Sequence, residues 1–331
     1  MTARKAALEL AIEGGPVLTG KINPRLVRLS LSEKREDDAD EMDLVLQNAD
    51  GLLEIPETGV TLSLALGWES GGDVPVGLVD KGKFIVDEVG QEGPPDRITI
   101  KARSADMTGA LRKLRTQSWT DIALGDLLDE IAGRHGRAAR VEAGLAVARI
   151  DAIEQEGKSD LAFVRDLGRR FDAIATWKNG LLLFLPIGGS STASGAALDT
   201  LALTKRQGWR WTYRQADREN FDGAEAQWQD QGAARRRTVQ VGGDNRRRLK
   251  NVYASESEAR QAAEAAASRA ARKPFRFTYD LAIAEPALQP DMKVALQGWG
   301  DKIDGTPWLI ESVRTEMGAR GLHQSIEMES A

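Results

Sequence analysis

A stretch near the middle of the chain, from Ser159 to Pro186, constrains the fold more than any other part of the sequence. It reads SDLAFVRDLGRRFDAIATWKNGLLLFLP. Ser159 is a good helix N-cap residue, and Asp160 places a negative charge in the first turn, where the helix dipole favours it. An apolar stripe then recurs at helical spacing, formed by Leu161, Phe163, Val164, Leu167, Gly168 and Phe171. We expect an amphipathic helix here.

The period of the apolar residues changes after this helix. Ala173–Trp177 and Leu181–Leu185 flank Asn179-Gly180, and Asn-Gly is the strongest short signal for a two-residue type I′ hairpin. The second of these strands is apolar at every position, which predicts a hairpin covered on both faces. A helix that leads into a buried hairpin forms a compact core against which the preceding and following segments can pack.

Residues 17–106 have the pattern of several short strands. Val60–Gly67 alternates apolar residues with small or polar ones, which is the period of a half-buried strand. Turn-rich sequences separate this run from four similar runs, at Leu26–Leu31, Met42–Leu46, Phe84–Val89 and Ile98–Ala102. Short strands at this spacing predict a small antiparallel barrel or sandwich.

Residues 107–186 have a mixed α and β character. Thr120-Asp121 predicts the start of a helix, and Gly133 or Gly136 can end it. One face of this helix would carry Ile122, Leu127, Leu128 and Ile131. The small, polar and Gly/Ser-rich segment 188–200 that follows the hairpin predicts a linker or mobile loop, and we place a domain boundary there.

The pattern of short strands returns beyond this segment, with one helix inserted. Ser255 and Glu258 form a capping box, which opens an alanine-rich helix that stops at Pro274. Strands are expected at Trp209–Tyr213, Ala224–Asp230, Arg237–Val241, Phe275–Ile283, Lys293–Gln297, Trp308–Thr315 and Leu322–Glu329. Two β units around an α+β middle are a hint of internal duplication, although no sequence repeat links them.

Few residues have the pattern of a catalytic or metal site. The two histidines, His135 and His323, form no metal-binding motif, and we expect them to be surface or packing residues. Gly77–Lys83 matches most of a phosphate-binding loop, but Phe84 replaces the required Ser/Thr and strands flank it, so we interpret it as a β-turn. The acidic run Glu36–Glu41 lacks the pattern of a Ca²⁺ loop, which favours a solvated loop. We expect no catalytic residue, metal site or cofactor.

Two arginine runs make the second half of the chain locally basic. Arg235–Arg237 and Arg246–Arg248, with Lys250, could pair with phosphates. No aromatic residue interleaves with them and they flank a predicted hairpin, VQVGGDN, so we favour a solvated hairpin or a salt-bridged subunit contact over nucleic-acid binding. Trp209 and Trp211 are expected on the same face of one strand. The tryptophans suit core packing or a large interface, whose residues the sequence does not identify.

The composition narrows the compartment in which the chain is made. It contains no cysteine, which excludes disulfides and thiolate metal sites and fits synthesis in a reducing compartment. The N-terminus is interrupted by Glu9 and Glu13, unlike a signal peptide, and no run approaches the ~20 apolar residues of a membrane helix. The formal net charge of −5 gives no general attraction to nucleic acid or anionic lipid. We expect a soluble protein made in the cytoplasm.

The order of four segments resembles the late control D family, the tail hub proteins of contractile-tailed phages. Related hubs include those of phage-like bacteriocins and the N-terminal half of type VI secretion spike proteins. The segments include FIVDEV followed by GPPD and ARSADM, and a closing VxLxG strand followed by a WxIxxV strand and a final strand ending in glutamate. They lie at residues 77–107, 111–136, 150–184 and 285–329.

This resemblance implies a mainly β fold with an α+β middle, in which two small antiparallel β-barrel domains bracket an α+β domain. With the patterns above, it implies domains at residues 1–106 and 107–187, a linker at 188–200, and a second barrel at 201–331 with an inserted helix at 255–273. It also implies a homotrimer that adapts the sixfold tail tube to a threefold spike, nucleates tube assembly and closes the tube until contraction. The implied partners are the trimeric spike protein, the tail tube protein and the tape measure protein, without nucleic-acid recognition or membrane insertion. The chain would be made in the host cytoplasm and incorporated in the tail of a virion or phage-like particle.

Other functions remain open on the sequence alone. The particle could be a phage, a bacteriocin or a type VI-like secretion device. From different classes, the chain could be a hub that carries cell-wall hydrolase activity, or a monomeric carbohydrate- or nucleic-acid-binding module that uses the tryptophans or the arginine runs. A dye-release assay on peptidoglycan would detect the hydrolase activity. Salt-dependent binding to DNA would indicate the nucleic-acid-binding module.

Overall fold

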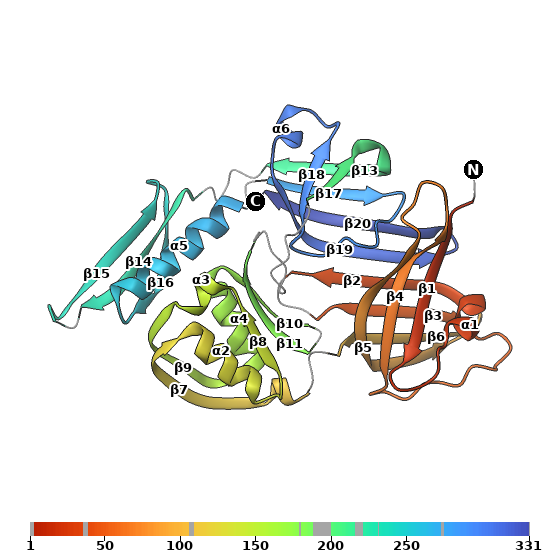
Figure 1. Cartoon of the computed structure of the whole chain (residues 1–331), viewed down its shortest axis with the longest axis horizontal. Coiled ribbons are helices and arrows are strands. Elements are labelled where there is room, and N and C mark those ends of the chain that lie inside the picture. Colours follow the sequence, from red (N-terminus) through yellow and green to blue (C-terminus); the bar gives the residue numbers. More distant parts are fainter. Residues whose placement is uncertain are drawn as a thin grey trace.

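A computed structural model of the whole chain describes residues 3–35, 39–105, 109–178, 180–187, 200–215, 221–230, 232–272 and 275–330. Strands dominate, and the chain is arranged as two curled sheets, a mixed α/β unit and a small sheet covered by one helix (Figure 1). No helix in these ranges is both long and apolar enough to cross a membrane. The expected fold class, mainly β around an α+β middle, is confirmed.

The N-terminal sheet has six strands in the spatial order β1-β4-β5-β6-β3-β2, all neighbours antiparallel. The strands are β1 Lys5–Ile12, β2 Leu26–Lys34, β3 Glu41–Gln47, β4 Thr61–Ser70, β5 Gly77–Glu92 and β6 Arg97–Ser104, with the short helix α1 at Thr19–Ile22. The alternation predicted for β4 turns Leu62, Leu64 and Leu66 into the core, where all three are buried. The sheet therefore curls around a core of its own.

The C-terminal sheet repeats this topology. Its strands are β12 Leu201–Thr204, β13 Gly208–Gln215, β17 Phe275–Leu281, β18 Lys293–Gln297, β19 Trp308–Gly318 and β20 Gly321–Ser330, with the short helix α6 at Asp301–Asp304. Their spatial order is β12-β18-β19-β20-β17-β13. Both sheets thus place their six strands, counted along the chain, in the order 1-4-5-6-3-2. One difference is that β1 runs antiparallel to β4, whereas β12 runs parallel to β18.

The middle unit contains the helix and hairpin expected from the sequence. Its elements are β7 Leu114–Ala123, α2 Leu124–Gly133, β8 Ala138–Val141, α3 Ala143–Ala146, β9 Arg149–Ser159, α4 Asp160–Phe171, β10 Ala173–Lys178 and β11 Leu181–Pro186. The Ser159 hydroxyl accepts the Ala162 N–H at 3.2 Å, which caps α4 as predicted. Strands β10 and β11 pair antiparallel, and β8 joins β11 in parallel. The predicted turn falls on Asn179, which lies outside the described residues.

Two predictions about local structure in the first two units are wrong. Helix α2 begins at Leu124 instead of Thr120-Asp121, because these two residues continue β7, which pairs with β9. The stretch Gly77–Lys83 is part of strand β5 and not a turn. The pairing of β4 with β5 slips at Lys81, which is the extra residue of a β-bulge.

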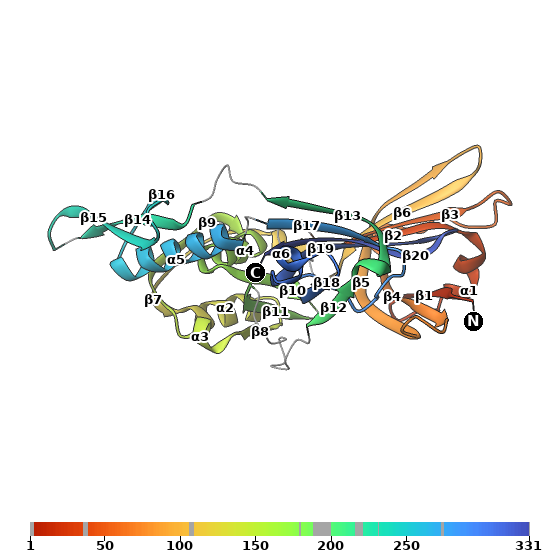
Figure 2. The ribbon, with the colours of Figure 1, turned by 90° about the horizontal axis from the view of Figure 1, so that it is seen from above.

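A small unit is inserted between β13 and β17. It comprises β14 Gly223–Asp230, β15 Arg235–Gly242, β16 Arg246–Tyr253 and helix α5 Glu256–Arg272, in the strand order β15-β14-β16. Strand β14 pairs antiparallel with β15 and parallel with β16, so the hairpin predicted at VQVGGDN does not exist. Buried alanines of α5, including Ala259 and Ala263, pack on one face of this sheet. Figure 2 shows the sheet above α5 in that view, on the side of the molecule where β13, β17, β2 and β3 lie.

The predicted capping box forms only in part. The Ser255 hydroxyl accepts the Glu258 N–H at 3.3 Å, as expected for an N-cap. The carboxylate of Glu258 is buried and forms an ion pair with Arg170 of α4 at 3.0 Å. Glu258 therefore connects α5 to the middle unit. Pro274 and most of the predicted linker, residues 188–199, lie outside the described residues.

Candidate assembly surface

The two curled sheets are joined edge to edge by β2 and β19. These strands pair antiparallel from Lys34 opposite Ser312 to Arg28 opposite Gly318. The pairing merges the two sheets into one sheet of 12 strands, as the ribbon shows (Figure 1). The continuous order across the junction is β5-β6-β3-β2-β19-β20-β17-β13. The two ends of the chain thus form one wide surface, which the sequence patterns did not predict.

Buried charges cross this junction. The guanidinium of Arg35, whose side chain is 3% exposed, forms ion pairs with Asp291 at 2.6 Å and with Glu329. It also donates to the carbonyl of Ile310 at 2.7 Å. Lys81, the bulge residue of β5, pairs with Glu33 at 2.9 Å, and both side chains are 4% exposed. The Lys81–Glu33 pair lies within the first sheet, but the Lys81 ammonium also donates across the junction to the carbonyl of Leu288 at 3.2 Å. The contacts of Arg35 and Lys81 with the second unit therefore fix how the two sheets meet.

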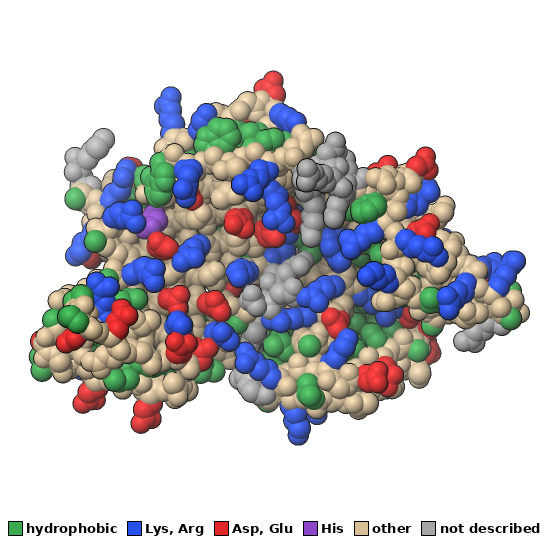
Figure 3. All heavy atoms as spheres, turned by 180° about the vertical axis from the view of Figure 1, so that it is seen from behind, with side chains coloured by type: hydrophobic (Ala, Val, Ile, Leu, Met, Phe, Trp, Pro, Cys, Tyr) green, Lys and Arg blue, Asp and Glu red, His purple; other side chains and the backbone are tan. Residues whose placement is uncertain are grey.

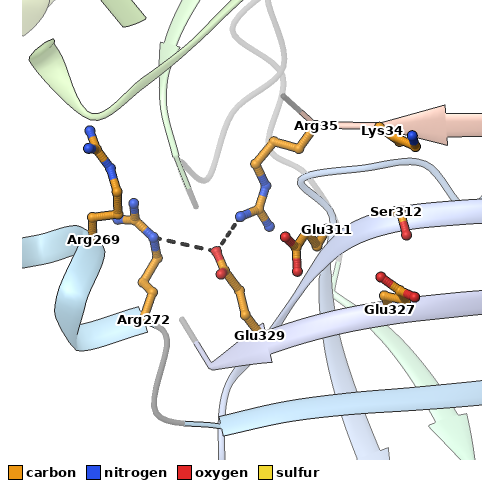
Figure 4. A pocket seen from close by; sticks show the side chains of 8 residues that line it. All are labelled: Lys34, Arg35, Arg269, Arg272, Glu311, Ser312, Glu327 and Glu329. Carbon is orange, nitrogen blue, oxygen red and sulfur yellow. Dashed lines mark hydrogen bonds and ion pairs between the residues drawn. The ribbon is translucent and has the colours of Figure 1, made fainter. Parts of the chain in front are cut away.

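The same cluster reaches the middle unit and helix α5. Arg272, in the last turn of α5, forms ion pairs with Glu329 of β20 at 3.6 Å and with Asp172. Asp172 ends helix α4 in a left-handed conformation, with φ of 52°. Figure 4 shows Arg35 and Arg272 converging on Glu329 from different elements, around a hollow of about 150 Å³. This cluster therefore connects all the units of the chain.

The outer face of the shared sheet is polar and its charges are largely paired. One row of laterally paired residues runs across seven strands, from Arg210 through Asp280, Ser325, Arg314, Ser32 and Glu41 to Arg103. Ion pairs on this face include Arg210 with Asp280 at 2.6 Å and Lys101 with Glu88 at 2.9 Å. Figure 3 shows this side of the molecule, with basic and acidic side chains interspersed. Such a face suits contact with water more than packing against an apolar partner.

Strand β13 forms a free edge of the shared sheet. Its one strand partner among the described residues is β17, and its register slips between Gly208 and Arg210. Trp209 is the bulge residue, 61% exposed, with its ring 6.1 Å from that of His323 on the outer face. Trp211 instead stacks on Phe277 of the core. The prediction that the two tryptophans share a face is therefore wrong, because the bulge reverses the alternation.

Beside this edge the outer face is hollowed. A depression of about 440 Å³ lies over β13, β17 and β20. Its lining includes Arg210, Arg214, Arg276 and Glu327. Charged side chains therefore dominate the surface next to the free edge.

The two histidines have structural surroundings. His135, 5% exposed, lies 2.8 Å from Asp160, and its ring packs edge-on against Trp177. Asp160 also pairs with Arg134 at 3.1 Å and Arg115 at 3.2 Å. His323 pairs with Glu316 at 3.3 Å. The packing interpretation holds for His135, whereas the surface interpretation does not.

The arginine runs lie at opposite ends of the small sheet. Arg235–Arg237 pair with the end of β14, and Arg246–Arg248 pair with its beginning. The sheet therefore separates the two runs and does not form one basic cluster from them. Within the described part of the chain, no group of His, Asp and Glu side chains could hold a metal ion. Residues 36–38 of the acidic run lie outside that part, while Glu41 of the run lies 3.5 Å from Arg103.

Comparison with known sequences identifies two close matches, although no protein-family model matches. The probable baseplate hub protein of Escherichia phage 186 is 31% identical over 354 residues, which cover 94% of this chain and 90% of that protein. The probable baseplate hub protein of Escherichia phage P2 is 32% identical over 353 residues, with coverage of 94% and 90%.

Solved structures share the fold over nearly the whole chain. The tail protein from Neisseria meningitidis MC58 has a TM-score of 0.68 at 12% identity, covering 98% of this chain and 96% of its own. The 43 kDa tail protein of prophage MuSo2 from Shewanella oneidensis has a TM-score of 0.67 at 15% identity, with the same coverage. The E. coli c3393 protein, a type VI secretion component, has a TM-score of 0.59 at 13% identity, covering 97% of this chain and 76% of its own.

Proposed function

The chain belongs to the baseplate hub proteins of P2-like phages, and we propose that it acts as a homotrimeric adaptor between the sixfold tail tube and the threefold central spike. The observation that carries the hub role is identity above 30% to two baseplate hub proteins over 94% of the chain. It is a structural protein of the phage tail and is incorporated in the virion.

The internal duplication supports the trimer. Each chain contributes two curled sheets with the same strand order, joined side by side through β2 and β19. Three chains would place six similar curled sheets around an axis, and this number matches a sixfold tube. The complete chain would occur three times around the same axis, and this number matches a threefold spike. Closed cyclic assembly would also cover the sheet edges that one chain presents.

The proposed domain limits follow the hydrophobic cores. Residues 1–106 contain most of one core, residues 107–187 a second, and residues 201–331 a third together with the small core under α5. Residues 188–200 would connect the second domain to the third. The shared sheet implies that the first and third domains move as one body, because strand pairing joins them.

The proposed partners are the trimeric spike protein, the tail tube protein and the tape measure protein. We assign no enzymatic activity to the chain, and the names of the curated relatives, which describe baseplate components, support this. A dye-release assay on peptidoglycan tests the assignment. No release is expected, and turnover by the purified chain would add a hydrolase function to the hub.

The trimer is tested by the solution mass from light scattering over a range of protein concentrations. A mass of three chains, each of 36.0 kDa, is expected. If the chain alone is monomeric, the same measurement with its spike protein should give a complex that contains three hub chains. A monomer in both experiments would contradict the adaptor function.

A further inference from the structure

The junction within one chain uses only one edge from each unit. It joins the second strand of the first unit, β2, to the fifth strand of the second unit, β19. The equivalent second strand of the second unit is β13, and the equivalent fifth strand of the first unit is β5. The strand order from β5 to β13 therefore ends in two edges of the same kinds as those in the junction. The edge of β5 lies at one end and the edge of β13 at the other.

Bulges align the second strands residue by residue. The pairing of β2 with β3 slips between Leu26 and Arg28. The pairing of β13 with β17 slips at the same place, between Gly208 and Arg210. Arg210 therefore occupies in the second unit the position that Arg28 occupies in the first, and the residues that follow correspond in step.

A second pair of bulges aligns the fifth strands. The pairing of β5 with β6 slips between Val86 and Glu88. The pairing of β19 with β20 slips between Ile310 and Ser312. Glu88 therefore corresponds to Ser312. The agreement of both bulges shows that the two units match in register as well as in strand order.

The relevant half of β5 has a free edge. Residues 78–85 of β5 pair with β4, and Val86 exchanges backbone hydrogen bonds with Gly59 and Val60. From Glu88 to Glu92, β6 is the one strand partner among the described residues. In β19 the corresponding half, residues 312–318, is the part that pairs with β2. The free half of β5 and the free edge of β13 are thus the two halves of a second junction.

We propose that β13 of one copy pairs antiparallel with the second half of β5 of the next copy, in the register of the junction within each chain. This inference rests on the proposed homotrimer and specifies its contact. Transferring the pairs Ser32–Arg314, Ser30–Glu316 and Arg28–Gly318 gives the pairs Arg214–Gly90, Thr212–Glu92 and Arg210–Pro94 between copies. Repetition of this contact continues the sheet from copy to copy until a ring closes.

The charges of the two edges are complementary. Arg214 on β13 and Glu92 on β5 are both exposed, and neither forms an ion pair with the described part of its own chain. In the proposed register the two residues lie on neighbouring rows of the same face, within reach across the strands. Arg210 would lie on the other side of Glu92. The contact therefore brings an acidic side chain between two basic ones.

Trp209 fits the same contact. It corresponds to the bulge residue Val27, which is 37% exposed and whose carbonyl lies close to Gly318 at the junction within the chain. Pro94 corresponds to Gly318, so the exposed Trp209 ring would lie beside the turn between β5 and β6. That turn projects beyond the body of the sheet (Figure 2). An exposed tryptophan at a sheet edge is accounted for by this partner.

Engineered cysteines test the register, and the chain contains no cysteine of its own to interfere. In the full chain, Gly90→Cys with Arg214→Cys should form disulfides between copies on mild oxidation, because directly opposed residues lie about 5 Å apart. An added Cβ at Gly90 meets no atom within 4 Å, so this change should not disturb the fold. Non-reducing gels should show covalent dimers and trimers, in the presence of the spike protein if trimers require it.

Controls separate the register from the trimer itself. Gly90→Cys with Arg210→Cys shifts one cysteine by four residues, about 13 Å along the strand, and should not cross-link. Each single cysteine should remain monomeric on the gel. A trimer by light scattering without the Gly90–Arg214 cross-link would overturn the proposed contact and leave the hub function intact. Absence of any trimer with the spike protein would overturn both.

Charge reversal provides a second test. Arg214→Glu or Glu92→Arg alone should lower the apparent association constant of the trimer about tenfold, since every interface gains a like-charge contact. The two changes combined should restore most of it. Arg140→Glu, an exposed site away from both edges, is the matched control and should have no effect. Equal weakening by the double variant and by the singles would contradict the pairing.

Discussion

Among single residues, the buried charges at the junction determine most about the arrangement of the chain. Arg35 is enclosed by Asp291 and Glu329 of the second unit, and Lys81, paired with Glu33, also donates to the Leu288 carbonyl across the junction. Buried ion pairs add little net stability compared with apolar packing, but removal of one partner leaves an uncompensated charge. Such pairs therefore penalise any arrangement in which the two sheets meet differently.

Replacing Arg35 with methionine should lower the free energy of unfolding by about 3–5 kcal/mol, because Asp291 and Glu329 would lose their shared cation. Urea denaturation at pH 7 measures this. Arg103→Met is the matched control, since its side chain is 51% exposed and its pairs with Glu41 and Asp87 are solvated. The control should cost less than about 1 kcal/mol. Similar losses in both variants would show that burial does not set the cost.

The exposed pair Arg25–Asp50 predicts a pH dependence. The hydrogen bond from Arg25, with a further one from the Leu52 N–H, lowers the pKa of Asp50 to about 2. Because the pKa of Asp50 is lower in the folded state, its ionised carboxylate stabilises the fold at pH values above the ordinary carboxyl pKa. This stabilisation is lost as the pH falls toward 2. Asp50→Asn should therefore be less stable than the native chain at pH 6, with a difference that shrinks from pH 4 downward. Urea titrations at several pH values measure it, and a constant difference would contradict the assignment.

Among elements, the packing of α4 on β10 depends on the absence of a side chain. A Cβ at Gly168 would lie 2.7 Å from the Ala175 Cβ and 2.8 Å from the Ala173 carbonyl oxygen. Gly168→Ala should destabilise the chain by about 1–3 kcal/mol, although alanine favours a helix by about 1 kcal/mol over glycine. Thermal or urea unfolding measures this.

Gly133→Ala in α2 is the control for this prediction. A Cβ there meets no atom within 4 Å, so the change should be neutral or slightly stabilising. Destabilisation of both variants to the same extent would mean that close packing against β10 is not the cause.

Elements set by local signals were predictable, and those set by distant pairing were not. Helix α4 begins where Ser159 and Asp160 predict, because its cap and dipole lie within one turn. Thr120-Asp121 has an equally good local signal, but pairing with β9 keeps it in a strand. The segment VQVGGDN has turn residues, yet the parallel partner of β16 is β14, which precedes it by two strands. Pairing between distant segments decided both cases.

Across the whole molecule, the duplication is visible in the topology and hidden in the sequence. Phe84 and Trp308 occupy equivalent positions by register, as do Met42 and Phe277, and all four are buried. Burial constrains such positions to be apolar but not to be identical, so the two units retained their pattern without retaining their residues. The shared sheet could not be predicted either, because its joining strands lie near opposite ends of the chain.

The duplication also predicts which part of the chain the proposed trimeric ring does not need. Between its second and third strands, the first unit has only the connection from Lys34 to Glu41, whereas the second unit inserts the small sheet and α5. Because β13 and β17 pair directly, replacing residues 216–274 with a connection of the length found in the first unit should preserve both the shared sheet and the trimer. Light scattering of this variant, with the spike protein where required, should therefore give the mass of three shortened chains.

The same deletion should loosen the middle unit. It removes Arg272 and Glu258, which pair with Asp172 and Arg170 at the end of α4. Amide hydrogen exchange in the last turn of α4 should accelerate, while exchange in β2 and β19 should stay slow, because their pairing does not involve the deleted residues. Loss of the trimer with an intact shared sheet would instead mean that the small sheet and α5 hold the copies together, since the edges of β5 and β13 would both still be present.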